Sequence, residues 1–384
     1  MRRFIMAASV VASQLATVDI EAADAIFPPQ AKHVHSSSLV ELANGDLVAC
    51  WYHGSGERQA NDVVIQGARL RRGADSWSPV FLMADTPGLP DCNPVLYVDT
   101  RQRLWLFWIV PVANRWEQSV LKYRRSDDPM PPGPVKWTWQ DSIHLVPGEP
   151  FADVVDEAFK VLQPHEGLWA EYALPYARLI REAAADPVKR QMGWMPRTHP
   201  LTLATGRILL PLYSDGFNVS LMAISDDMGE TWRASQPIVG LGPIQPTVVR
   251  REDGSLVAYM RDSGDAPHRV LMATSDDDGE SWSIATDTEI PNSGSSLEII
   301  RLHNGKWAMA YNDTEHGRYR LTLALSSDQG KTWSTAKVLE YDPTQQASYS
   351  YPSIMQDRKG RVHVTYSHSD RGMETIRHAA IDID

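Results

Sequence analysis

The chain has 384 residues and a formal net charge of −11 at neutral pH. This acidity argues against nucleic acid or an anionic membrane surface as a partner, although a local basic pocket could still hold an anionic sugar. Two cysteines, Cys50 and Cys92, are too few for a disulfide framework, and no metal site or other cofactor is expected. Beyond the N-terminal region, no apolar run is long enough to span a membrane, so no membrane insertion is expected.

The N-terminal region reads as an export signal. Two arginines precede an apolar run, and Ala23-Asp24-Ala25 has the small-x-small form of a signal-peptidase site. Residues 1–25 are therefore predicted to be a signal peptide that directs the protein to the periplasm or the outside of the cell. The alternative is an ordinary first strand. Residues 26–384 are predicted to form one domain.

Two local patterns recur along the rest of the chain. One is a hairpin, an apolar strand, a tight turn with polar residues and a second strand, which begins near Ser37, Asn93, His199, Gln245, Ser295 and Tyr351. The other is a strand that runs into S-x-D-x-G-x-[ST]-W. Its copies begin at Leu221, Leu271 and Leu321, and so recur about every 50 residues. In each copy the aspartate can bond its own turn, and the glycine permits positive φ.

This recurrence predicts an all-β fold, a six-bladed β-propeller with four strands per blade, with seven blades as the alternative. After the last hairpin only ETIRHAAID remains, so the final blade lacks one strand. The segment near Ile26-Phe27 could supply that strand and close the ring. The tryptophans that end the turn motifs, Trp232, Trp282 and Trp333, are expected to pack these turns against the sheet behind them on the outer rim.

One region interrupts the repeats between the second and third blades, over residues 151–194. Residues 168–185 have helical apolar spacing, and Asp186-Pro187 ends the pattern. About 45 residues cannot bury a core of their own, so this is predicted to be a helical insertion in the propeller. We expect it to lie beside the binding site, and the alternative is a side decoration.

The innermost strands of a propeller begin around its central channel. The repeat therefore selects the residues just before those strands as candidates for a binding site. They are mostly polar or aromatic: His35, Asp91, Asn93, Arg197, His199, Gln245, Ser295, Tyr349 and Tyr351. The alternative for each of them is a satisfied polar group that fills the channel.

The repeated turn resembles the Asp box of the sialidase (BNR-repeat) superfamily. The resemblance covers nearly the whole chain as fold but only part of the site. In SYSYPSIMQDRKG it puts Tyr351 at the nucleophile, and in QPTVVRREDGSLVAYMRD it puts Arg261 at one arginine of the family's triad. It makes Asp62 in QANDVVIQ the candidate acid/base, with Glu57 nearby.

The chain departs from the family at three of these positions. Gln245 stands where the glutamate that activates the tyrosine belongs, and His35 and Ala324 stand at the other two arginines of the triad. Glutamine cannot act as that base, and a single arginine would bind a carboxylate weakly in the usual pose. The chain is more similar to sialidase-like BNR proteins often labelled exo-α-sialidase, which carry a histidine at the first hairpin and the runs IQP and SSLE.

The resemblance implies an exo-acting glycoside hydrolase that acts on an acidic or deoxy sugar and is not an ordinary sialidase. Asp62 would be the general acid, Arg261 and Arg197 would bind the substrate, and Tyr351 or His35 would supply the second catalytic group. A first alternative is a uronic-acid polysaccharide lyase in which His35 or His199 takes the C5 proton. A second alternative is a non-catalytic sugar-binding propeller.

Overall fold

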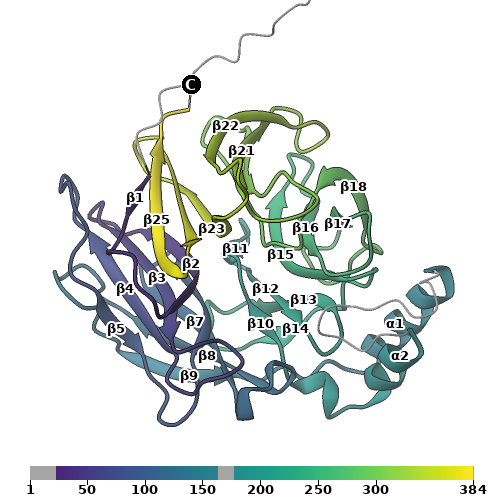
Figure 1. Cartoon of the computed structure of the whole chain (residues 1–384). Coiled ribbons are helices and arrows are strands. Elements are labelled where there is room, and N and C mark those ends of the chain that lie inside the picture. Colours follow the sequence, from purple (N-terminus) through teal and green to yellow (C-terminus); the bar gives the residue numbers. More distant parts are fainter. Residues whose placement is uncertain (1–22, 163–176, 384) are drawn as a thin grey trace, which may run out of the picture.

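The computed structural model describes residues 23–162 and 177–383. In these ranges the strands form six sheets arranged around a central axis, which confirms the predicted six-bladed propeller (Figure 1). Each blade is an antiparallel meander whose first strand lies innermost. The inner strands of neighbouring blades pack on one another, as β2 does on β6 and β23. Residues at the starts of these strands therefore meet at the axis.

The strands of the first three blades follow chain order from the axis outward. Blade one contains β2 (His33–Glu41), β3 (Leu47–Gly54), β4 (Val64–Leu70) and β5 (Phe81–Ala84). Blade two contains β6 (Cys92–Val98), β7 (Leu104–Pro111), β8 (Ser119–Ser126) and β9 (Trp139–Ile143). In blade three the inner strand is split, because β10 (Met195–Pro196) and β11 (Leu201–Thr202) both pair with β12 (Ile208–Ser214), followed by β13 (Val219–Ser225) and β14 (Arg233–Ala234).

The remaining blades repeat this order, with one exchange in the last. Blade four contains β15 (Pro243–Arg250), β16 (Leu256–Asp262), β17 (Arg269–Ser275) and β18 (Thr286–Pro291). Blade five contains β19 (Glu298–Arg301), β20 (Trp307–Tyr311), β21 (Arg320–Ser326) and β22 (Ser334–Tyr341). Blade six contains β23 (Ser348–Gln356), β24 (Val362–Asp370), β25 (Met373–Ile381) and, from the start of the chain, β1 (Asp24–Ala25).

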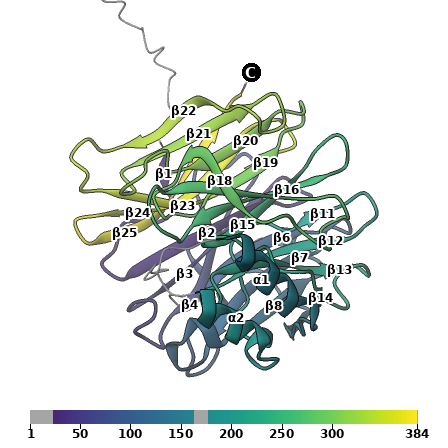
Figure 2. The same ribbon diagram turned by 90° about the vertical axis from the view of Figure 1, so that its right-hand side faces the viewer.

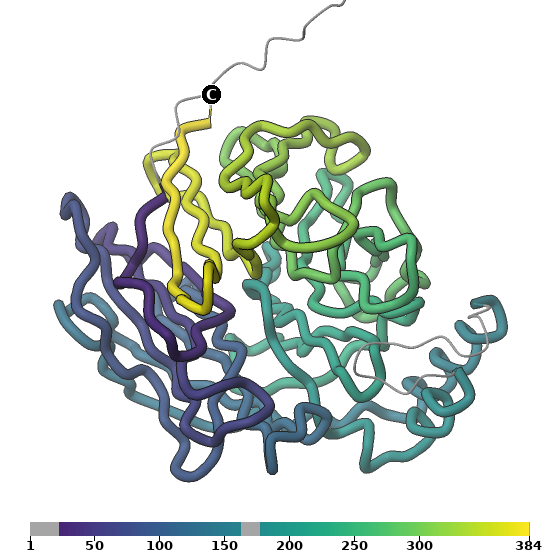
Figure 3. Tube along the Cα trace, viewed as in Figure 1, coloured from purple at the N-terminus to yellow at the C-terminus, as the bar shows by residue number. Residues whose placement is uncertain are grey.

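Strand β1 closes the ring. Asp24 and Ala25 pair with His378 and Arg377, and the Ile26 amide donates to the Ile376 carbonyl, so β1 and β25 lie side by side (Figure 3). The closing strand predicted near Ile26 is thus present, two residues earlier than expected. Cleavage after Ala25 would remove both paired residues of β1. The predicted signal otherwise falls on residues 1–22, outside the described residues, and it stays a prediction.

The three Asp boxes satisfy their own polar groups. In the first, Ser225 Oγ donates to Asp227 Oδ1 at 2.8 Å, and that oxygen also accepts the Thr231 amide at 2.9 Å. Gly229, with φ of 88°, donates its amide to Ser225 Oγ. The copies built on Asp277 and Asp328 repeat these bonds. This local chemistry explains why the motif could be recognised from sequence.

The tryptophans of these turns pack between blades, away from the axis, as predicted. Trp232 meets Phe107 of blade two edge-on at 5.9 Å, and Trp333 meets Tyr259 of blade four at 6.1 Å. Their side chains are only partly buried, however, whereas Trp307 in β20 is 1% exposed.

This difference in burial predicts a difference in stability. Trp307→Ala is expected to lower the free energy of unfolding by about 3–5 kcal/mol, the usual loss for a fully buried aromatic residue. Trp232→Ala should cost less, because part of its ring stays in water when the protein is folded. Urea unfolding of the wild type and both variants measures which substitution lowers the free energy of unfolding more. Equal losses would show that the turn tryptophan is held as tightly as a core residue.

The helical insertion lies on the outer side of blades two and three (Figures 1 and 2). It contains α1 (Pro150–Val161), α2 (Ala177–Ala185) and the short 3-10 helix η3 (Lys189–Gln191). The predicted helix ends at Ala185 as expected, but residues 168–176 lie outside the described residues. Helix α1 was missed. Phe151 anchors it by edge-on contacts with Trp194 and Phe217. Across the described ranges, no helix is long and apolar enough to cross a membrane.

Candidate functional site

A polar pocket lies on the propeller axis and receives side chains from all six blades. Its cavity volume is ≈ 90 Å³. The lining residues are His35, Tyr52, Glu57, Arg58, Asn93, Trp116, Tyr213, Asp215, Gln245, Arg261, Arg318 and Tyr351. Three guanidinium groups, two carboxylates and three phenols in so small a volume form a built site rather than a packed core.

Unusual backbone conformations place three of these side chains. Asn93, Gln245 and Tyr351 have φ of 49°, 55° and 54°, and each precedes a proline. Each also lies at a bulge where the inner strand loses register with its neighbour. Left-handed backbone is unfavourable for residues other than glycine and more so before proline, at a cost of about 1–3 kcal/mol each. These three strained positions, one in each of three blades, all lie at the pocket.

Tyr351 is the centre of the pocket. Its hydroxyl accepts hydrogen bonds from Arg261 Nη1 at 2.8 Å and from Gln245 Nε2 at 3.2 Å. The His35 ring lies 4.2 Å from the Tyr351 ring, measured between centroids. Two further guanidinium groups, those of Arg197 and Arg318, lie 5.1 and 5.4 Å from the same ring centroid. Negative charge that develops on the Tyr351 oxygen would therefore be stabilised.

A second tyrosine is bound in the same way on blade three. The Tyr213 hydroxyl accepts from Asn93 Nδ2 at 2.8 Å and from Gln245 Nε2 at 3.3 Å. Burial raises the pKa of Tyr213 well above its usual value, so the group stays a phenol. Gln245 thus links the two tyrosines across the axis.

Arg58 joins three blades at one wall of the pocket. It reaches from the β3–β4 loop, where its φ is 61°, and its Nη2 donates to Asp215 Oδ2 of blade three at 2.6 Å. Its guanidinium also lies 4.0 Å from the ring centroid of Trp116, in the short 3-10 helix η2 (Trp116–Gln118) of blade two. Burial alone would lower the pKa of Arg58, but the charge of Asp215 raises it.

Glu57, on the same loop, is the other carboxylate of the pocket. It accepts a hydrogen bond from the Tyr52 hydroxyl, and its Oε2 lies 3.9 Å from His33 Nε2. Burial acts to raise the pKa of Glu57, but His33, His35 and Tyr52 together lower it to about 2. The carboxylate is therefore ionised at neutral pH. Burial lowers the pKa of His35 to about 3, so that imidazole is neutral.

The pocket contains six of the twelve residues predicted for the site: His35, Glu57, Asn93, Gln245, Arg261 and Tyr351. The prediction that Asp62 faces this pocket is wrong. Its carboxylate is 46% exposed and is held by Ser55 and Lys32 on the outer side of its loop. Hydrogen bonds from Ser55 lower the pKa of Asp62 to about 2, the opposite of the raised value that a general acid needs.

The other five predicted residues do not line the pocket. Ser295 is buried just before β19, and its carbonyl accepts from Asn292 Nδ2 at 3.0 Å. Arg197 is buried beneath Tyr351 and donates to the carbonyls of Ser37 and Pro352. Asp91 is buried in blade two, where it accepts from Thr86 and Trp108. Tyr349 stacks on His368 at 5.1 Å. His199 lines a separate cavity, and its Nδ1 is 2.8 Å from Glu298 Oε1.

Six lining residues were missed: Tyr52, Arg58, Trp116, Tyr213, Asp215 and Arg318. Arg58 and Arg318 thus stand beside Arg261, which the sequence indicated as the one arginine kept at a triad position. Tyr52 and Tyr213 could have been found, because both sit near the end of the second strand of their hairpins, as Arg261 does. The other four come from loops of unequal length, for which the repeat gives no register.

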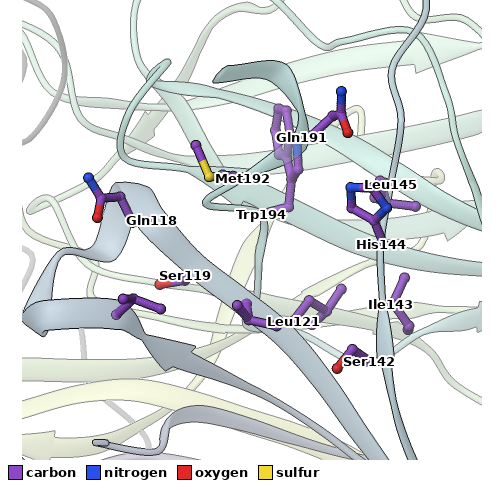
Figure 4. Close-up of a pocket in the computed structure, with 12 residues that line it drawn as sticks. Gln118, Ser119, Leu121, Ser142, Ile143, His144, Leu145, Gln191, Met192 and Trp194 are labelled. Atoms are coloured by element: carbon purple, nitrogen blue, oxygen red, sulfur yellow. The ribbon is translucent and has the colours of Figure 1, made fainter. Parts of the chain in front are cut away.

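The insertion contributes no lining residue in its described ranges, although it touches the wall. The Gly193 amide donates to the Ser119 carbonyl, and a side chain at Gly193 would collide with the backbone of Glu117, next to Trp116. A larger cavity of ≈ 270 Å³ opens on the outer side of this contact, between β8, β9 and the end of the insertion (Figure 4). Its walls are mainly apolar, so we place the site at the axis, where the charged groups converge.

Comparison with known proteins agrees with this architecture. The family described as BNR repeat-like domain matches residues 45–170 and 188–364, which is most of the chain. The chain therefore belongs to the BNR repeat-like family, within the sialidase superfamily that its Asp boxes resemble.

Named relatives share only part of their length with this chain. A sialidase from Micromonospora viridifaciens is 31% identical over 140 residues, 34% of this chain and 21% of that protein. An anhydrosialidase from Macrobdella decora is 27% identical over 184 residues, 43% and 24% of the two chains. The chain thus spans about a quarter or less of each of these proteins. The NanB sialidase of Streptococcus pneumoniae (K499G mutant) superposes with a TM-score of 0.68 at 11% identity, over 97% of this chain and 73% of that one, which shows a shared fold.

Proposed function

We propose that this protein is an exo-acting glycoside hydrolase that removes an acidic or deoxy sugar from the end of a glycan and differs in specificity from an ordinary sialidase. The observation that carries the proposal is the Tyr351 hydroxyl, which accepts hydrogen bonds from Arg261 and Gln245 in a pocket enclosed by six blades. An enclosed pocket of this kind suits the terminal residue of a chain rather than its interior.

The lining residues suit the two halves of such a reaction. The Tyr351 oxygen would bond to the anomeric carbon as the glycosidic bond breaks, with Arg261 stabilising the charge on that oxygen. Glu57, the ionised carboxylate of the pocket, would accept the Tyr351 proton and pass it to the leaving oxygen. A water would then break the bond between Tyr351 and the sugar, with its hydroxyl going to the anomeric carbon and its remaining proton to the Tyr351 oxygen. Arg318 and Arg261 are placed to bind an acidic substituent through charge-assisted hydrogen bonds.

Gln245 separates this pocket from the sialidase pattern. The amide donates to both Tyr351 and Tyr213, but it cannot take a proton from either of them. Any base must therefore be another group. We propose a specificity other than sialic acid because His35 and Ala324 stand where the resemblance expects two further triad arginines for the sialic acid carboxylate.

One observation favours a lyase as the second candidate. His35 is neutral and packs on Tyr351, so one ring could take the C5 proton of a uronic acid while the phenol protonates the leaving oxygen. The pocket arginines would neutralise the uronate carboxylate. Alternatively, loss of the usual base would leave a sugar-binding propeller without turnover.

A substrate screen separates these three functions. The purified protein is incubated with aryl sialosides, rhamnosyl-glucuronides and uronate polymers. Hydrolysis releases a saturated terminal sugar, elimination produces an unsaturated uronide with new ultraviolet absorbance, and a binding module changes neither. Release of a saturated acidic sugar other than sialic acid is the expected result. Efficient release of sialic acid from an aryl sialoside would contradict the proposed specificity.

The two candidate carboxylates can be distinguished on the substrate that the screen identifies. Glu57→Gln is expected to lower kcat by about 10²-fold or more, the usual contribution of a proton-transfer group. Asp62→Asn should leave kcat nearly unchanged, because Asp62 lies outside the pocket. Steady-state kinetics of both variants provides the measurement. The reverse order would return the catalytic role to Asp62.

A further inference from the structure

One histidine connects the pocket to the edge of blade six. His33 lies on β2 two residues before His35, and its ring is placed between two carboxylates. Nδ1 is 3.0 Å from Glu374 Oε2, and Nε2 is 3.9 Å from Glu57 Oε2. Glu374 belongs to β25 and Glu57 to the β3–β4 loop, so the imidazole bridges an outer strand and the pocket wall.

Both carboxylates are fixed independently of the histidine. Glu374 Oε2 accepts the Val34 amide at 2.6 Å, and the Glu374 backbone exchanges hydrogen bonds with Gln30, its amide donating at 2.7 Å. Glu57 is held from the other side by the Tyr52 hydroxyl. The distances around His33 are therefore set by the fold and not by the histidine alone.

The charges around His33 favour its protonated form. It is surrounded by Tyr52 and His53 of β3, Glu57 of the adjoining loop, Glu374 of β25 and His35 of its own strand. Burial would lower the pKa of His33, but the hydrogen bond of Glu374 and the charges of Glu374 and Glu57 raise it to about 9.

We propose that His33 is a positioning residue, which Glu374 holds as a cation and which in turn keeps the Glu57 carboxylate ionised and in place at the axial pocket. Glu57 is then a proton acceptor in the resting enzyme rather than a proton donor. One proton moves from Tyr351 to Glu57 during the reaction and from there to the leaving oxygen, while His33 keeps its own. The role of Glu57 in turnover rests on the proposed function, but the charge state of His33 does not.

The first test needs no substrate. Proton–nitrogen NMR of imidazole-labelled protein follows the protonation of His33, identified by its loss in His33→Gln. In the wild type His33 is expected to stay protonated at neutral pH and to titrate near pH 9. In Glu374→Gln the titration midpoint should fall by about 1 pH unit or more, because a neighbouring negative charge is lost. His33 titrating at its ordinary value of about 6.5 in the wild type, or an unmoved midpoint in Glu374→Gln, would overturn the proposal.

The second test uses the pH dependence of kcat/KM on the substrate found by the screen. In His33→Gln the positive charge beside Glu57 is lost, so Glu57 becomes protonated at a higher pH. The fall of kcat/KM on the acid side of the pH profile should therefore shift upward by about 1–3 pH units. His53→Gln, a change of similar size on the neighbouring strand, is the control and should leave the limb in place. A lower kcat with an unmoved limb would mean a merely structural role and overturn the proposal. If no substrate is turned over, the proposed function fails and the NMR titration alone decides the role of His33.

Discussion

Tyr351→Phe is expected to lower kcat by about 10²–10⁴-fold, because the variant loses the one hydroxyl to which the pocket directs an arginine and an amide. The ring would remain, with its contacts to His35 and Arg197, so the substrate should still bind. The same loss is expected for hydrolysis and for elimination, since Tyr351 is the reacting group in both.

The control for this variant is Tyr341→Phe, which removes a hydroxyl from an exposed residue of β22. Kinetics with both variants, together with calorimetry of ligand binding, separates loss of chemistry from loss of fold. Full activity in Tyr351→Phe would mean that the axial tyrosine only fills the channel, and the search would move to another face of the propeller.

A large loss of stability is also expected from Glu298→Ala. The Glu298 carboxylate is 2% exposed and lies in the channel below the pocket. Its Oε1 accepts the His199 amide at 2.7 Å and pairs with the His199 ring, and its Oε2 accepts the Ile354 amide at 2.9 Å. One side chain thus joins blades three, five and six. Its removal would leave buried donors and a cationic partner without an acceptor, at a cost of about 3–5 kcal/mol.

The sign of the pH effect follows from the same contacts. Burial acts to raise the pKa of Glu298, but the charge and hydrogen bonds of His199 lower it overall. A depressed carboxyl pKa stabilises the fold at neutral pH, and this contribution is lost as the pH falls through the folded-state pKa. Melting temperatures of Glu298→Ala and of the exposed control Glu289→Ala should therefore differ most near neutrality and converge in acid. If Glu298→Ala lowers the melting temperature no more than the control does, the contacts of Glu298 do not stabilise the fold.

The fold could be predicted because its signals are local. The bonds of Ser225, Asp227 and Gly229 close within one turn, and each hairpin carries its own alternation of apolar residues. Helix α1 carried a signal too, since Phe151, Val155 and Ala158 share one face and are all buried. The helix of the insertion was predicted only over residues 168–185, where the helical spacing is clearer, and so α1 was missed.

About half of the site could be predicted, and the division has a physical cause. Asn93, Gln245 and Tyr351 were found because each occupies the same bulge of an inner strand, and the repeat fixes that position. Arg58 and Arg318 come from loops, where a difference of one residue redirects a side chain. Asp62 was placed by family likeness alone, and the bonds of its own loop hold it elsewhere.

The two-residue strand β1 has a consequence beyond its size. The six blades meet only if the ring is complete. At the junction of blades one and six, completion depends on contacts rather than on chain connectivity, because β1 pairs with β25 and β2 packs on β23. A molecule that loses this pairing would keep every hairpin and every turn, but it could spread into a crescent. The axial pocket, which takes one or more side chains from each blade, would then disperse while most of the core stayed folded. A ligand that binds on the axis would accordingly stabilise the closed ring relative to the open crescent by the free energy of ligand binding.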